Sequence, residues 1–302
     1  MGSEMCIRDS TNADVYMIID TESFKFDNKL LPLQIAWCAY SWNENELIQM
    51  SDITTIYIYE ILNNQLYRSV LEELSPKCLK KHENNICGSN YPIMFAADVL
   101  IRLETFIREL NVTTLVGYNI SWDFAAIGNM ISFIKSPSSS FDPTCDNPFN
   151  PMRLNYIDLM HVTVKKYGQQ LAAAGVVEGI IHRAEDSNRI MLRKNNKYSK
   201  SIYSASYVLQ HFFNITQEHL AQHDVEHEAL LLQKCIKDFG QSAMELNICH
   251  PQNNCYQRML HFANEVIDNE EEEEEVVCLF TDTDTKTENY LLDLSKDKDE
   301  LN

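Results

Sequence analysis

The architecture follows from the stretch Val15-Tyr16-Met17-Ile18-Ile19-Asp20-Thr21-Glu22. Its apolar half is rich in β-branched residues and predicts a buried strand that leaves the core at Asp20. Side chains alternate faces along a strand, so Asp20 and Glu22 are expected to project together from its C-terminal end. Two neighbouring carboxylates repel each other unless a cation lies between them, which makes the pair a candidate metal ligand set. The same pattern is also an ordinary polar strand end, so it gains weight only from other residues.

A second strand and helix follow the same logic. The strand at 114–117 ends in Gly117, and the segment after it has apolar residues at helical spacing. Asp123 therefore opens a helix directly after a strand, which is where crevices form in α/β sheets. An N-terminal helix cap is the alternative for Asp123, and the segment alone leaves both open.

A histidine and an acid five residues apart mark the third segment, His223 and Glu228. Asp224 is expected to cap a helix that continues through Leu230 to Lys234. In that case His223 lies just before the helix and Glu228 about one turn inside it. A histidine in such a place is more often a surface or capping residue, and the spacing to Glu228 is what favours a functional role.

In this order the three segments resemble the DEDDh family of 3′→5′ exonucleases. The resemblance covers about residues 14–240 and includes the apolar segments 33–37 and 156–159. It implies a ribonuclease H-like, three-layer α/β fold with a mixed, mostly five-stranded sheet flanked by helices. One departure stands out, because the family almost always has Asp where this chain has Glu228.

The resemblance also implies a chemistry and a ligand set. Two Mg²⁺ or Mn²⁺ ions would be held by carboxylates, with Asp20 touching both, Glu22 and Glu228 holding the one that activates water, and Asp123 supporting the other. His223 would be the general base, and the residues expected to contact substrate are Thr21, Ser23, Asn119 and Trp122. Hard cations of this kind prefer carboxylate oxygens, which agrees with the residue types. The expected substrate is single-stranded or 3′-frayed DNA or RNA, and the product is nucleoside 5′-monophosphate.

Two other classes of protein remain open. One is a module that keeps the exonuclease fold for binding nucleic acid or protein without useful catalysis, which Glu228 and the net charge favour. The other is a metal-dependent phosphoesterase that acts on a small substrate. With 25 basic and 44 acidic residues the chain carries −19, which weakens the encounter with nucleic acid.

Much of this negative charge lies near the C-terminus, and its uneven distribution suggests how the chain is divided into regions. From Glu265 onward there are 15 acidic and 3 basic residues. We expect a leader at residues 1–13, an exonuclease-like domain at 14–264, and an acidic, largely disordered tail at 265–302. The apolar residues 276–280 interrupt the tail, so a short docking motif for a protein partner is an alternative to a purely solvated tail.

Two insertions are expected within the domain, at about 136–152 and 182–200. The first is rich in Ser, Pro, Asn and Asp and predicts a loop. The second gathers basic residues with interleaved tyrosines, and it reads either as a hairpin or loop that lies against substrate or as a charged surface insertion.

The remaining sequence predicts scaffold and location. Strands at 33–40 and 52–59 are expected to be neighbours, and the segment 95–110 has the apolar spacing of a helix. Nine scattered cysteines favour a reducing compartment, with free thiols rather than a zinc site at the loose Cys/His clusters 78–87 and 249–261. No stretch of about eighteen apolar residues occurs, and the N-terminus lacks a signal-peptide pattern. We therefore expect an intracellular protein, cytoplasmic or nuclear, without a membrane span.

Overall fold

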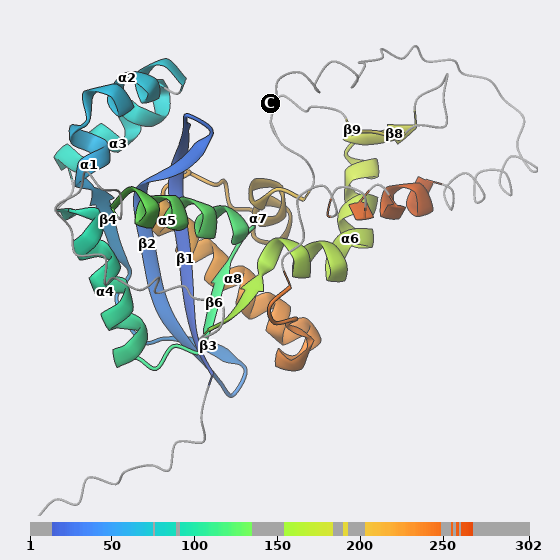
Figure 1. Ribbon diagram of the computed structural model, residues 1–302. Helices are drawn as coiled ribbons and strands as arrows, with labels where there is room; N and C mark the ends of the chain where they lie inside the picture. Colours follow the sequence, from blue (N-terminus) through green and yellow to red (C-terminus); the bar gives the residue numbers. More distant parts are fainter. Residues whose placement is uncertain are drawn as a thin grey trace, which may run out of the picture. The chain divides into compact units, whose positions relative to one another are not determined.

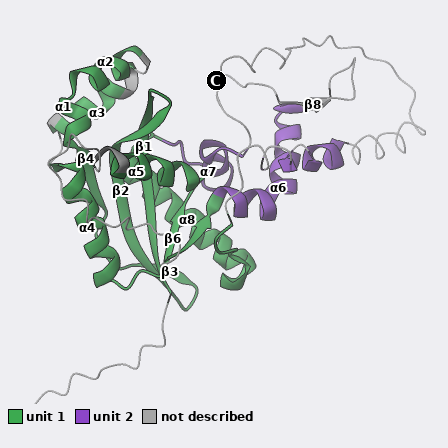
Figure 2. Cartoon of the chain, in the orientation of Figure 1, with its two compact units in different colours: residues 1–159, 218–249 green, residues 160–217, 250–302 purple. Residues whose placement is uncertain are grey.

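The computed structural model describes residues 14–267, apart from 75, 89–90, 135–153, 184–189, 193–202, 249–254, 256–257 and 260 (Figure 1). The chain divides into two compact units, residues 1–159 with 218–249 and residues 160–217 with 250–302 (Figure 2). The sequence predicted one domain through residue 264. The candidate site residues all belong to the first unit.

A mixed seven-stranded sheet organises the first unit. Its strands are β1 (Val15–Phe26), β2 (Lys29–Asn43), β3 (Glu46–Gln49), β4 (Thr54–Ile58), β5 (Ile93–Met94), β6 (Thr114–Gly117) and β7 (Asn155–Asp158). The order is β5-β4-β2-β1-β6-β7, with β3 paired to β2. Strand β2 is antiparallel to β1, β3 and β4, whereas β6 is parallel to β1, β7 to β6 and β5 to β4. The predicted α/β class with a mixed sheet is confirmed, and the short strands β3 and β5 raise the strand number above the predicted five.

Helices flank both faces of this sheet (Figure 1). The helices of the unit are α1 (Tyr59–Asn63), α2 (Gln65–Leu74), α3 (Pro76–Gly88), α4 (Ala96–Glu109), α5 (Ser121–Ile134) and α8 (Ala221–Phe239), with a 3₁₀ turn at Gln241–Ala243. Helix α4 buries Ala96, Val99, Leu100 and Leu103, the spacing that predicted it. The structure confirms the predicted helix at 95–110 and the strand at 114–117. It also confirms that the strands predicted at 33–40 and 52–59, which are β2 and β4, are neighbours.

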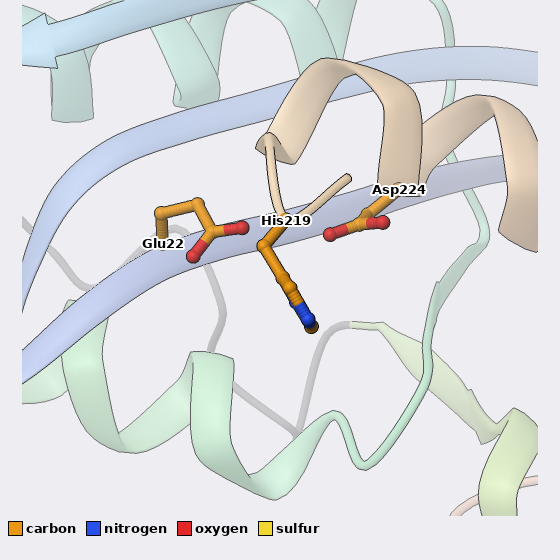
Figure 3. Close-up of side chains that lie close together, drawn as sticks. All are labelled: Glu22, His219 and Asp224. Atoms are coloured by element: carbon orange, nitrogen blue, oxygen red, sulfur yellow. The ribbon is translucent and has the colours of Figure 1, made fainter. Parts of the chain in front are cut away.

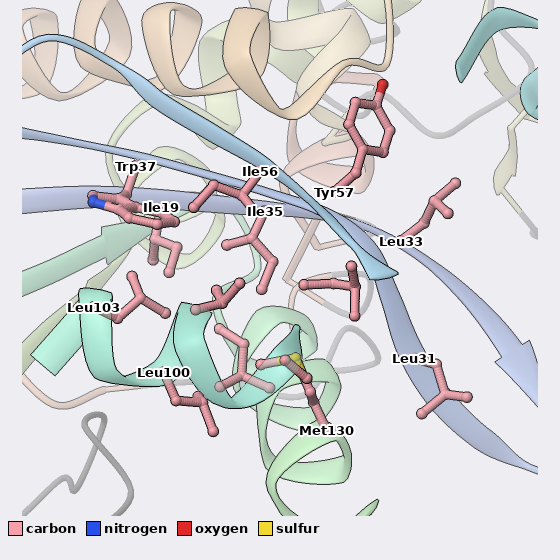
Figure 4. Packing of buried hydrophobic residues seen from close by; sticks show 14 of the residues in the cluster. Ile19, Leu31, Leu33, Ile35, Trp37, Ile56, Tyr57, Leu100, Leu103 and Met130 are labelled. Carbon is pink, nitrogen blue, oxygen red and sulfur yellow. The ribbon is translucent and has the colours of Figure 1, made fainter. Parts of the chain in front are cut away.

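Alternation along β1 and β2 sorts their side chains between the two faces. The odd-numbered residues Ile19, Ile35 and Trp37 are buried in the cluster that contains Leu100 and Leu103 of α4 (Figure 4). The even-numbered positions face α8, where the Gln34 Oε1 accepts a hydrogen bond from the Ala221 backbone N–H at 3.1 Å. Asp20 and Glu22 are even-numbered, so their carboxylates lie on the α8 side of the sheet.

Strand β1 does not end at the two carboxylates as the sequence predicted. It continues to Phe26, with a register shift between Glu22 and Ser23, and pairs with β2 through a tight hairpin. Asp27 and Asn28 form the turn with φ of 47° and 59°, the left-handed backbone that a two-residue hairpin requires. The carboxylates therefore lie inside a long strand beside an irregularity, and not at its tip.

The second unit contains nearly all of α6 (Leu159–Val177), then β8 (Ile181–Arg183), β9 (Ile190–Leu192), α7 (Ala205–Phe213) and a helical segment that reaches residue 267. Within this unit a Cβ on Gly168 would lie 2.2 Å from the Phe262 ring, so glycine at position 168 allows α6 and the last helical segment to approach closely. Strands β8 and β9 pair antiparallel, so the basic insertion includes a hairpin. Most of its basic residues, and the segment 136–152, lie outside the described residues.

Contacts of the second unit continue past residue 264, where the sequence placed the start of the tail. Glu265 pairs with His261 at 3.3 Å and accepts a hydrogen bond from Gln169 at 3.3 Å, and Ile267 is 7% exposed. The packed part of the second unit therefore extends at least to Ile267. Residues 268–302 lie outside the described residues, so the docking motif for a protein partner stays a prediction.

A candidate metal centre at the carboxyl ends of the strands

Six acidic side chains converge where parallel strands end. They come from β1, from the first turn of α5, from the last residue of β7 and from α8, and they are Asp20, Glu22, Asp123, Asp158, Asp224 and Glu228. Strands β6 and β7 run parallel to β1, and their carboxyl ends lie beside the middle of β1, where the pairing of β1 with β6 has ended. The structure thus brings together all four acids that the sequence singled out, Asp20, Glu22, Asp123 and Glu228, and adds two more.

Asp123 is bound to β1 and is not a helix cap. Helix α5 begins at Ser121, so Asp123 lies in its first turn, and it is only 3% exposed. Its Oδ1 accepts two hydrogen bonds from Thr21, one from the backbone N–H at 2.9 Å and one from the hydroxyl at 2.7 Å. Thr21 is buried and orients this carboxylate, and its predicted contact with substrate stays a prediction.

The turn between β6 and α5 is held by two acids. The Tyr118 N–H donates to Glu228 Oε1 at 3.1 Å, and the Asn119 N–H donates to Asp158 Oδ1 at 3.1 Å. Asn119 adopts a left-handed backbone (φ 60°), and its side-chain Oδ1 accepts the Ser121 hydroxyl at 3.0 Å. A Cβ at Gly117 would lie 3.2 Å from the Ile19 carbonyl oxygen, so a larger residue would press this turn away from β1.

Burial and mutual repulsion make the cluster a poor place for uncompensated charge. Burial, followed by repulsion from the neighbouring carboxylates, raises the pKa of Asp20 and of Glu228 well above the usual range. Burial raises the pKa of Asp123 to about 7 although its Thr21 hydrogen bonds oppose the shift. Asp20 Oδ2 and Glu228 Oε2 are buried without a hydrogen-bond partner among the described residues. Protons or a cation must balance these oxygens.

One group has the geometry to hold a metal ion at the outer side of the cluster. Ligand atoms of Glu22, His219 and Asp224 all lie within 4.8 Å of one another (Figure 3). Glu22 comes from β1, Asp224 from the first turns of α8, and His219 from the residue before the N-cap of that helix, with a left-handed backbone (φ 53°). Asp224 is 4% exposed, whereas the His219 side chain is open to solvent.

His223 occupies a different place from the predicted one. Helix α8 begins at Ala221 with Leu220 as N-cap, so His223 lies in the first turn and not before it. Its Nδ1 lies 3.2 Å from the exposed Glu218 carboxylate, and no described metal-ligand group includes it. The helix starts four residues earlier than predicted, with Leu220 and not Asp224 at the N-cap, because Gln34 of β2 accepts the Ala221 N–H. Asp224 instead lies near Glu22 of β1, and Glu228 lies one turn further along the same face of the helix.

The residues that sequence reasoning missed are His219, Asp224 and Asp158. His219 and Asp224 are five residues apart, the same spacing as His223 and Glu228, so the segment 219–228 carries the pattern twice. That repeated spacing was the available signal. Of the remaining predicted substrate contacts, Trp122 is 41% exposed, whereas the Ser23 hydroxyl donates to Thr21 Oγ1 at 3.0 Å.

No protein-family model matches this chain, and no curated protein shows significant similarity to it. Among the described residues, no helix combines the length and the apolar character needed to cross a bilayer. Most cysteines of the two loose Cys/His clusters lie outside the described side chains, and His82 is buried against the Tyr57 hydroxyl at 3.1 Å.

The raised carboxylate pKa values predict how the stability of metal-free protein depends on pH. Asp20, Asp123 and Glu228 hold protons more tightly in the folded than in the unfolded chain, where carboxyl pKa values are about 4. The free energy of unfolding should therefore fall as pH rises from about 4 through about 7. Thermal unfolding in chelator at several pH values measures this slope.

Two variants distinguish the effect of the buried carboxylates on this slope from the effect of the other acidic residues. Asp20→Asn should flatten the slope, whereas Asp52→Asn, at an exposed position in the loop between β3 and β4, should leave it unchanged. Added Mn²⁺ should restore stability at high pH, because a cation replaces the protons. Equal slopes in all three proteins would show that the buried carboxylates are not responsible.

Proposed function

We propose that this chain is a metal-dependent 3′→5′ exonuclease of the DEDDh type, which hydrolyses phosphodiester bonds of single-stranded or 3′-frayed nucleic acid and releases nucleoside 5′-monophosphates. The observation that carries the proposal is the convergence of Asp20, Glu22, Asp123 and Asp224 with His219 beside two of them. Carboxylate-rich sites of this kind suit Mg²⁺ or Mn²⁺.

The residues present fit such ions. Two buried carboxylate oxygens lack a hydrogen-bond partner, and the cluster contains acids without a described thiol. When bound, a pair of divalent cations lowers the pKa of a water molecule and stabilises the charge that develops at phosphorus. Asp20, Glu22, Asp123 and Asp224 would hold the ions, and Thr21 would orient Asp123.

His219 is the better candidate for the general base. It lies beside Glu22 and Asp224 and is exposed, so an imidazole nitrogen can accept a proton from water at the outer side of the cluster. Imidazole titrates close to neutral pH, and a positioned base typically contributes 10²- to 10⁴-fold. His223 instead faces Glu218.

Assigning His219 and Asp224 also strengthens the resemblance to the DEDDh family. The pair keeps the spacing of five and has Asp at the acidic position, so the departure at Glu228 disappears. Glu228 then becomes an additional carboxylate that holds the Tyr118 turn. Without β3 and β5 the sheet reduces to β4-β2-β1-β6-β7, which agrees with the mixed five-stranded sheet of a ribonuclease H-like fold.

The net charge of −19 is the observation that favours a different substrate. A chain with this charge attracts a polyanion poorly, and a phosphoesterase acting on a small substrate would need no such attraction. The same cluster could serve that reaction, so the choice of substrate in the test must include a small phosphodiester.

Digestion of labelled oligonucleotides tests the proposal. Wild-type protein should release mononucleotides from a single strand with Mg²⁺ or Mn²⁺ and lose this activity in chelator, because the acids cannot activate water without a cation. Matched DNA and RNA strands identify the sugar preference, and a chromogenic thymidine 5′-phosphodiester identifies a small-substrate phosphoesterase. Undiminished hydrolysis in chelator, or binding of strands without any hydrolysis, would contradict the proposal.

A further inference from the structure

An exposed aromatic pair lies at the same edge of the sheet as the acidic cluster. Tyr59 is 41% exposed and Phe95 is 51% exposed, and their ring centroids are 4.6 Å apart with planes tilted by 51°. Strands β4 and β5 run parallel to β1, and the two rings directly follow their last residues, Ile58 and Met94. They belong to the first unit, as do all the acids.

Hydrogen bonds between a side chain and the backbone link the two segments that carry the rings. Both carboxylate oxygens of Glu60 accept the N–H of Ala96, at 3.1 Å and 2.9 Å. Glu60 follows Tyr59, and Ala96 follows Phe95, so this bifurcated bond ties together the two backbones that carry the rings. The backbone positions of Tyr59 and Phe95 are therefore held side by side at this edge of the sheet.

The strand register relates the pair to the acids. Ile93, Tyr57, Gln34 and Glu22 are aligned across β5, β4, β2 and β1, and the two rings lie two residues beyond this row. Neighbouring strands are about 4.8 Å apart, so β4 and β5 lie about 10 Å and about 15 Å from β1 along the edge. A few nucleotides of a single strand can span this interval.

The surroundings of the pair suit unpaired nucleotides. Arg102 is exposed, and its Nη1 lies 3.9 Å from the Met94 sulfur next to Phe95, where it can meet a phosphate. Ile93, 44% exposed, leads into a hollow of about 460 Å³ between α1, α2 and α3 with a mainly aliphatic lining. Asp98 is the exposed acid of the first turn of α4, so the local charge is mixed and stacking must supply most of the attraction.

We propose that Tyr59 and Phe95 form a stacking subsite for unpaired bases of a single-stranded nucleic acid, upstream of the bond that is hydrolysed. The proposal rests on the exonuclease function proposed above and names the part of the substrate that this chain recognises. Aromatic faces bind bases of any sequence, and single-strand binding proteins combine them with cations along a groove. Such a subsite offsets the unfavourable net charge of the chain and favours single strands over duplexes.

Kinetics on long and short substrates test the subsite. Phe95→Ala and Tyr59→Ala should each raise KM for a single-stranded octanucleotide by about 10-fold, because each removes one stacking face. The kcat for this substrate, and the hydrolysis of a chromogenic thymidine 5′-phosphodiester that cannot reach the pair, should change little. Phe95→Trp should keep the low KM, and Ile101→Ala, at a 49% exposed position of the same helix α4, is the matched control.

Each outcome has a distinct meaning. Unchanged KM in both alanine variants, or an equal loss on the small substrate, would overturn the subsite while leaving the exonuclease proposal intact. If wild type hydrolyses neither substrate, the exonuclease proposal fails. In that case, fluorescence anisotropy of a labelled octanucleotide still decides whether the pair binds bases. Anisotropy that is insensitive to Phe95→Ala would mean that the pair serves another occupant, such as a protein.

Discussion

His219→Ala should slow the hydrolysis of a single-stranded oligonucleotide by about 10²-fold or more, whereas His223→Ala should change it by less than about threefold. The reason is geometric: His219 lies within 4.8 Å of the Glu22 and Asp224 ligand atoms, and His223 pairs with the exposed Glu218. A general base acts on water and not on the ion, so Mn²⁺ affinity should fall less than turnover in His219→Ala. Initial rates and Mn²⁺ titration of the two variants measure both quantities.

Each histidine variant is the control for the other, because the two substituted residues are of the same type and lie four residues apart, on either side of the start of α8. A pH profile adds a second check, since loss of the general base should change the acidic limb of the rate curve. If His223→Ala proved the slower enzyme, the base would be His223 as the sequence spacing first indicated, and the loop before α8 would have to rearrange on binding substrate.

Asp224→Asn should weaken Mn²⁺ binding and turnover together, by about 10²-fold or more, because it removes a ligand that faces Glu22 and His219. Glu228→Gln should cost much less. Its amide oxygen can still accept the Tyr118 N–H, and the change removes a buried carboxyl group whose ionised form neighbouring acids disfavour. Metal-free Glu228→Gln should therefore unfold at a higher temperature than wild type.

Shortening the same side chain gives a sharper comparison. Glu228→Asp should lower activity modestly, since a shorter carboxylate reaches the Tyr118 N–H less well. A clear gain of activity in Glu228→Asp would mean that residue 228, and not Asp224, occupies the position where the DEDDh family has Asp. The present assignment of ligands would then be wrong.

The main strands of the sheet and four acids of the cluster could be predicted because the signals are local. The run from Val15 to Ile19 specifies a strand, and alternation places Asp20 and Glu22 on one face whatever the rest of the chain does. Helix α4 and strand β6 follow equally from apolar spacing, and their bounds match the prediction within one residue. Asp123 was placed correctly at the start of a helix, although its binding to Thr21 links residues 102 positions apart.

The start of α8 could not be predicted because it depends on a distant residue. Gln34 binds the Ala221 N–H across 187 positions, and this contact moves the helix start away from Asp224. Without it, two overlapping His-to-acid pairs with the same spacing cannot be ranked. The role of Asp158 is equally tertiary: it depends on β7 pairing with β6 so that its carboxylate meets the Asn119 N–H.

Digestion of a 5′-labelled single strand by wild type and by Asp20→Asn, each with Mn²⁺ and with chelator, tests the proposed metal-dependent exonuclease most directly. Asp20 is repelled by four other acids of the cluster, which are Asp123, Asp224, Glu228 and Glu22, and its Oδ2 is buried without a hydrogen-bond partner among the described residues. Wild type with Mn²⁺ should shorten the strand stepwise from its 3′ end, and both Asp20→Asn and chelator should stop this shortening while circular dichroism shows a folded chain. Stepwise shortening at the wild-type rate by folded Asp20→Asn would contradict the proposal.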